Sequence, residues 1–87
     1  MRYIKFEDGV QWKGYLQVHE TIRGFSCYVC SEEAGEKLLI TRDRAENLGL
    51  SLPITYKHIT FGTKADAEAM MARIAKLNGF SKLEDNI

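Results

Sequence analysis

The strictest pattern of hydrophobic and polar positions covers residues 10–19, where the two kinds of side chain alternate. The apolar or small set is Val10, Trp12, Gly14, Leu16 and Val18, and the set between them is Gln11, Lys13, Tyr15, Gln17 and His19. Because successive side chains of a strand point to opposite faces, this period of two predicts a half-buried strand. Gly14 interrupts the apolar set, which indicates a bulge, a bend or a close backbone approach.

Other alternating segments predict further strands on both sides of this one. Apolar and polar side chains alternate over residues 3–7, with Phe6 in the apolar set. Asp8-Gly9 follows as a hairpin turn, because a type I′ turn needs positive φ at both central positions. Pro53 precedes a segment of strand composition and belongs at a strand start or edge, since Pro cannot donate to a ladder. The strands predicted after residue 19 cover residues 25–30, 37–41 and 54–61.

Two helices are predicted in the second half of the chain. Thr41 can cap a short helix over residues 42–48. The longer helix opens at Thr63, which with Asp66 forms a capping box, and it stops at Gly79, which can adopt the positive φ of a helix end. Its apolar stripe follows helical spacing and consists of Ala67, Met70, Met71, Ile74 and Leu77.

Together these elements predict an α+β fold. We expect an antiparallel sheet of four to five strands, with the short helix and the C-terminal amphipathic helix packed on one face. Residues 1–80 are expected to form a single domain, and residues 81–87 a frayed C-terminal tail. The predicted core consists of Phe6, Trp12, Leu16, Phe25, Val29, Met70 and Ile74.

The amino-acid composition limits the classes of binding partner and the cellular compartment that we expect. The 87 residues carry 12 basic and 12 acidic side chains, which argues against a strongly basic nucleic-acid binder and against an acidic mimic of DNA. An acidic stretch over residues 20–36 precedes a basic one over residues 37–64, typical of two solvated surfaces or of a basic rim on a binding face. The first residues do not resemble a signal peptide, and no apolar run is long enough to span a bilayer. With two cysteines, we expect a cytoplasmic protein with reduced thiols and no membrane contact.

Cys27 and Cys30 have the spacing of half a zinc site, and His19 and His58 are the imidazoles that could complete it. A regular strand over residues 25–30 would place the two thiols on opposite faces. Free thiols, a zinc-stabilised module and a redox pair therefore remain as alternatives, and no cofactor is expected. No serine lies in a nucleophile-elbow spacing, and no glycine-rich phosphate loop is present, so we do not expect an enzyme.

Aromatic side chains on the polar side of the strands are the best candidates for binding. Tyr3, Tyr15 and Tyr28 are assigned to that side, together with Lys13 and His19. Tyrosines can anchor a protein interface, can stack nucleic-acid bases beside cations, or can fill the rim of a small core. We expect a larger protein or protein complex as partner ahead of a nucleic acid, and exposed strand edges also allow a homodimer.

Residues 58–80 read HITFGTKADAEAMMARIAKLNGF, a strand followed by a Thr-x-x-Asp-Ala helix start and a Lys-Leu-Asn-Gly stop. This ending, with the short chain, resembles the small accessory proteins that bacteriophages and mobile elements encode, among them anti-CRISPR and other anti-defence inhibitors. The resemblance implies a non-catalytic inhibitor in the host cytoplasm that blocks a defence complex by steric occlusion. It assigns a role to no individual residue.

Overall fold

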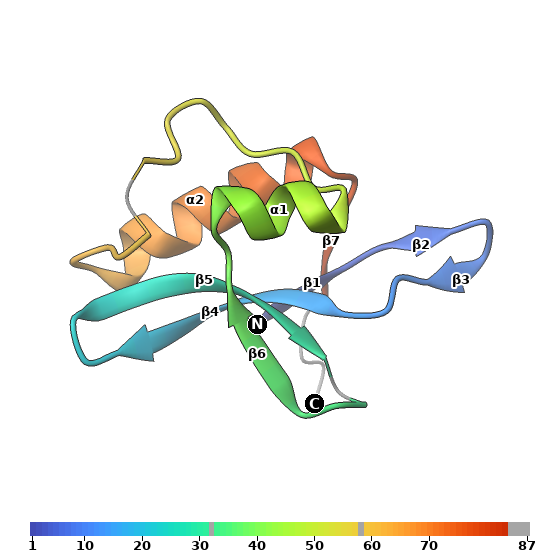
Figure 1. Cartoon of the computed structure of the whole chain (residues 1–87), viewed down its shortest axis with the longest axis horizontal. Helices are drawn as coiled ribbons and strands as arrows, with labels where there is room; N and C mark the ends of the chain where they lie inside the picture. The colour runs from blue at the N-terminus through green and yellow to red at the C-terminus, as the bar shows by residue number, and fades with distance from the viewer. Residues whose placement is uncertain (32, 58, 84–87) are drawn as a thin grey trace.

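Two long strands, β4 (Tyr15–Thr21) and β5 (Gly24–Ser31), pair antiparallel at the centre of a five-stranded sheet in the computed structural model. The structure describes residues 1–31, 33–57 and 59–83. The sheet order is β6-β5-β4-β1-β7, all neighbours are antiparallel, and both helices lie on one face (Figure 1). The predicted α+β class is confirmed. The other strands of this sheet are β1 (Arg2–Ile4), β6 (Glu36–Leu39) and β7 (Ser81–Leu83).

The Asp8-Gly9 turn connects a separate hairpin, β2 (Phe6–Glu7) and β3 (Val10–Gln11), that projects away from the sheet (Figure 1). The two turn residues have φ values of 52° and 80°, as a type I′ turn requires. Phe6 is 60% exposed and Val10 is 70% exposed, so the expectation that they face the core is wrong. The reason is that, among the residues that the structure describes, β2 and β3 pair only with each other, and neither helix lies over them (Figure 1).

The alternation in the first strand has the opposite phase to the predicted one. Tyr3 pairs with Leu16, and residues that face each other across an antiparallel ladder point to the same side of the sheet. Leu16 lies under the helices, and Tyr3 therefore lies there too, only 9% exposed. Burial raises the pKa of the Tyr3 hydroxyl, and the nearby carboxylate of Glu68 adds to the rise. The prediction that Tyr3 belongs to the outward binding set is wrong.

The core lies between the inner face of the sheet and the helices. Leu16, Ile74 and Val29 are buried as predicted, while Trp12 and Phe25 are half-buried at its edge. Trp12 packs edge to face against Phe80, with ring centroids 5.4 Å apart. The side chains with the least exposure are Leu16, Cys27, Ile40, Met71 and Ile74.

Both predicted helices are present with the predicted caps. In α1 (Arg42–Leu48), the Thr41 hydroxyl accepts from the amide of Arg44 at 3.1 Å, and Gly49 ends the helix with φ 73°. In α2 (Lys64–Leu77), the Thr63 hydroxyl accepts from the amide of Asp66 at 3.1 Å. Met71 and Ile74 of the predicted apolar stripe are buried against β4 and β5, and Met70 packs at the edge of the core. Leu77, also predicted for the stripe, is 55% exposed, so its assignment to the packed face is wrong.

The strand expected over residues 54–61 is not formed by the described part of that segment. Its backbone is irregular, and the one ladder contact joins Phe61 to Phe25 through two hydrogen bonds of 2.7 and 2.9 Å. Hydrogen bonds to other elements hold it instead, because the Tyr56 hydroxyl donates to the Ile40 carbonyl at 2.6 Å and Arg42 donates to the Tyr56 carbonyl at 2.9 Å.

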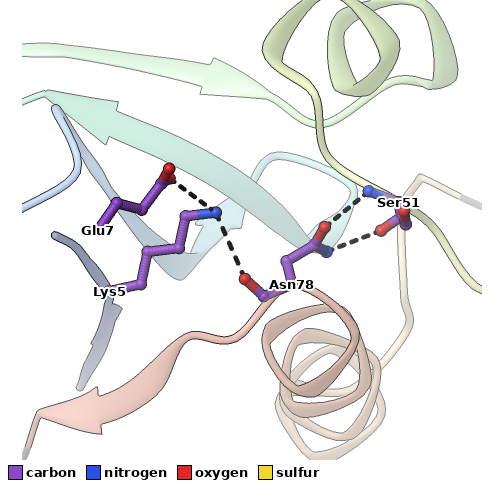
Figure 2. A network of polar contacts seen from close by, with 4 residues as sticks. All are labelled: Lys5, Glu7, Ser51 and Asn78. Atoms are coloured by element: carbon purple, nitrogen blue, oxygen red, sulfur yellow. Dashed lines mark hydrogen bonds and ion pairs between the residues drawn. The ribbon is translucent and has the colours of Figure 1, made fainter.

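The C-terminal end of α2 supplies the fifth strand. β7 pairs with β1 along its whole length, so residues 81–83 of the expected tail belong to the sheet, and residues 84–87 lie outside the described residues. Asn78, just before this strand, joins three parts of the chain (Figure 2). The Asn78 side chain exchanges two hydrogen bonds with the backbone of Ser51, at 2.7 and 2.8 Å. The backbone carbonyl of Asn78 accepts a hydrogen bond from the ammonium of Lys5 at 3.4 Å.

Candidate functional site

The face of the sheet opposite the helices, here called the outer face, has no helix over it (Figure 1). The register pairs Tyr15 with Cys30, Gln17 with Tyr28 and His19 with Ser26, and each pair points to the same side. Since the neighbouring pair of Leu16 and Val29 faces the core, these pairs face outward. The strand residues on this face are Arg2, Ile4, Tyr15, Gln17, His19, Thr21, Gly24, Ser26, Tyr28, Cys30, Lys37, Leu39, Ser81 and Leu83.

Charge is distributed unevenly between this face and the rest of the molecule. None of the outward strand residues just named is an aspartate or a glutamate, although the chain has as many acidic as basic side chains. Arg2 and Lys37 contribute positive charge to it. The strand residues of the outer face are therefore aromatic and cationic, while Glu20 and Glu36 lie at its margin, where each lines a hollow together with Lys37.

The two outward tyrosines are already in contact with cations. The guanidinium of Arg2 lies 4.0 Å from the ring centroid of Tyr15, and the ammonium of Lys37 lies 5.5 Å from that of Tyr28. His19 packs edge to face on Tyr28, with centroids 5.5 Å apart. These contacts favour particular orientations of the two rings and keep both cations close to them.

Lys13 lies beside the outer face rather than on it. It is exposed in the link between β3 and β4, where it lines a hollow of about 230 Å³ together with Tyr15 and Glu33. The structure thus brings Tyr15, Tyr28 and His19 together and leaves Lys13 at their margin. Lys5 does not lie on this face, because its ammonium lies 5.1 Å from the ring centroid of Phe80, which is part of the core.

A thiol and an imidazole meet on the outer face. Sγ of Cys30 lies 3.6 Å from Nε2 of His19, in a hollow of about 440 Å³ that Tyr15 and Lys37 also line. Burial raises the pKa of the Cys30 thiol, although Tyr15 and nearby cations act in the opposite direction. Burial and the charge of Lys37 lower the pKa of His19. Near pH 7 both groups are therefore neutral, unlike the thiolate and imidazolium of an activated nucleophile.

Cys27 faces the opposite way. It is fully buried, its Sγ lies 3.6 Å from the carbonyl oxygen of Ala67, and burial raises the pKa of the thiol to about 12. The Cys-x-x-Cys spacing thus falls within a regular strand, and Cys27 and Cys30 cannot bind the same ion. Within residues 1–31, 33–57 and 59–83, no three metal-ligating side chains are grouped. His58, the other imidazole considered for zinc, lies outside the described residues.

Sequence reasoning did not assign Arg2 or Lys37 to this surface. Lys37 could have been found, because it alternates with Leu38 in a predicted strand and so had to face away from the core. Arg2 could not, because β1 has only three residues and the phase of such a short alternation is ambiguous.

Comparisons with protein-family models, with curated protein sequences and with solved structures found no match to the chain. Neither helix in the described part of the chain has the length and apolar composition that crossing a bilayer requires.

Proposed function

We propose that the protein is a small non-catalytic interaction module of the cytoplasm that docks through its outer face onto an acidic surface of a larger protein. The observation that supports this proposal is the composition of that face, which combines tyrosines and cations with no carboxylate among its strand residues. Complementary charge steers such an encounter and disfavours partners of the same sign.

A protein surface suits the tyrosines better than a series of stacked bases. A base needs an open ring plane, and the rings of Tyr15 and Tyr28 already have Arg2 and Lys37 over or beside them. Tyrosine also brings a large contact area at a small cost in rotamer entropy. Carboxylates of the partner can pair with the cations at the positions where the rings hold them.

The resemblance to phage accessory proteins supports a specific form of this proposal. A domain of this size that covers an acidic surface of a host defence complex would exclude that surface from its normal partner. The mechanism is steric occlusion, and it needs affinity and bulk but no reactive group. This agrees with the neutral state of the Cys30 and His19 pair near pH 7.

A single-stranded nucleic acid is the second candidate for the same face. The absence of carboxylates among its strand residues favours phosphate as well. Phosphate neutralisation dominates that kind of binding and makes it steeply dependent on salt. Only two cations of the described strands lie on the face, Arg2 and Lys37, so we rank this function below protein binding.

The test uses Lys37→Glu and Tyr28→Ala, with Lys76→Glu, at an exposed position of α2 away from the outer face, as the matched charge control. Partners captured from a cell lysate are identified by mass spectrometry, and their affinities are then measured by titration calorimetry with each variant. We expect both outer-face variants to weaken binding at least about tenfold and Lys76→Glu to leave it unchanged. Tight binding of oligonucleotides that both outer-face variants abolish would instead establish the second candidate.

A further inference from the structure

One edge of the sheet is formed by β6, which has β5 on one side and, within the described part of the chain, no strand on the other. The amide of Ile40 donates to the carbonyl of Cys27 at 3.0 Å, which fixes the hydrogen-bond phase of the ladder. In an antiparallel pair, every second residue bonds to the neighbouring strand. Glu36 and Leu38 therefore bond to β5, while the backbone N–H and C=O groups of Lys37 and Leu39 point to the free edge.

Arg44 of α1 occupies one of these edge groups. Its Nη1 donates to the Leu39 carbonyl at 2.7 Å. No other hydrogen bond from the described residues reaches the outward groups of Lys37 and Leu39. One of the four outward groups, the Leu39 carbonyl, is thus capped by a side chain, and two donors and one acceptor stay open. Open edges of this kind are where a further strand can add.

We propose that β6 pairs with β6 of a second copy of this chain about a two-fold axis at Leu38. This register places Lys37 opposite Leu39 of the second copy, and the two residues exchange N–H···O=C bonds in both directions. A two-fold axis perpendicular to the sheet keeps each face on its own side, so only registers centred on a residue are allowed. Centring on Lys37 would set two ammonium groups directly opposite each other, which is unfavourable.

Leu38 provides the apolar contact at the axis. It points to the helix side of the sheet, opposite Val29, yet it is 38% exposed because α1 covers it incompletely. In the proposed dimer each Leu38 lies against Leu38 of the second copy. The pairing also joins the two outer faces into one continuous cationic surface.

Arg44 opposes this association, because each copy must release its bond to Leu39 before that carbonyl can accept from the second copy. Self-association of the natural protein is therefore weak and dependent on concentration. Replacing Arg44 by methionine keeps the aliphatic part of the side chain and removes the donor. We expect the dimer to tighten by about tenfold for each copy, the contribution of one charged hydrogen bond.

The experiment is sedimentation equilibrium of the full chain up to millimolar concentration, with circular dichroism to confirm folding. The variants are Arg44→Met, the matched control Arg42→Met, and Lys37→Pro with its own control Lys37→Gln. Arg42 lies on the same helix but bonds to the Tyr56 carbonyl, away from β6, so its removal should not tighten the dimer. Lys37→Pro removes an N–H that points away from β5, a position where an edge strand accepts Pro.

We expect dimerisation to strengthen in Arg44→Met and to be lost when Lys37→Pro is added, whereas Lys37→Gln retains it. If Arg44→Met does not fold, loss of the natural protein's own association in Lys37→Pro but not in Lys37→Gln supports the proposal equally. A monomer at every concentration in both the natural protein and Arg44→Met would overturn it, and so would a dimer that survives Lys37→Pro. The result is independent of the proposed function, since Tyr28→Ala on the outer face should leave self-association unchanged.

Discussion

Asn78→Ala should destabilise the fold by removing the joint between the end of α2 and the irregular segment that follows α1. The Asn78 amide makes three hydrogen bonds, one accepted from the amide of Ser51, one donated to the Ser51 carbonyl and one donated to the Ile74 carbonyl (Figure 2 shows the two with Ser51). Alanine can make none of them, and the long connection from Gly49 to Thr63 loses its contact with the helix end.

The magnitude follows from the number of bonds and their exposure. A net hydrogen bond contributes about 0.5–1.5 kcal/mol to the free energy of unfolding. The two bonds to Ser51 are exposed and belong at the low end of that range, and the bond to Ile74 is partly buried. We therefore expect a loss of about 2 kcal/mol. In a domain of this length, that corresponds to a fall in Tm of about 8–16 °C.

Differential scanning calorimetry measures this change, and two further variants sharpen it. Ser51→Ala should have almost no effect, because Ser51 contributes only backbone atoms. Asn78→Asp should cost at least as much as alanine, because it loses the donor and places negative charge at the C-terminal end of α2. If Asn78→Ala melts at the temperature of the natural protein, the Asn78 bonds contribute nothing, and the hydrogen bonds of Tyr56 and Thr55 with other elements hold the segment.

Three more changes test other parts of the fold. Tyr56→Phe leaves the buried carbonyl of Ile40 without its donor and should cost about 1–3 kcal/mol in urea unfolding; an unchanged midpoint would mean that water replaces the hydroxyl. Gly24→Ala should lower the free energy of unfolding by about 1–3 kcal/mol, because φ at this position is 142° and strains an alanine backbone. Overlap of the new Cβ with the carbonyl oxygen of Phe61 adds a further cost, and an unchanged Tm would contradict this packing. Burial raises the pKa of the Cys27 thiol to about 12, so we expect it to react with Ellman's reagent at pH 8 only after unfolding. If peptide mapping shows that Cys27 of the folded chain is labelled rapidly, its burial is refuted.

The parts of the fold that sequence predicted well have long, regular patterns. The strand predicted over residues 10–19 is divided into β3 and β4 by a link at residues 12–14, yet its alternation correctly separated Leu16 from Tyr15. The capped apolar stripe correctly located α2. Both patterns extend over several turns or pleats, so a local irregularity does not change their phase. The short β1 has no such redundancy, and Tyr3 was assigned to the wrong face for that reason.

Strand composition misled where tertiary contacts decide the outcome. Residues 54–61 have β-branched and aromatic side chains, yet β6 occupies most of the adjacent edge of β5 and leaves only Phe25 for Phe61 to pair with. The three residues after Phe80 look like a polar tail, and they become a strand because β1 offers them an unpaired edge. Local sequence predicts neither the lost strand at residues 54–61 nor the formation of β7, because each outcome depends on which strand edge is unpaired in the folded sheet.

The opposite orientation of Cys27 and Cys30 has a consequence for oxidation. Three steps along a strand separate their Cα atoms by about 10 Å, beyond the reach of a disulfide. Oxidants therefore cannot close an internal bridge within β5 while the sheet is intact. Cys30 points to the outer face but is itself buried, only 3% exposed, so neither thiol is open to an oxidant until the strands separate or the chain unfolds.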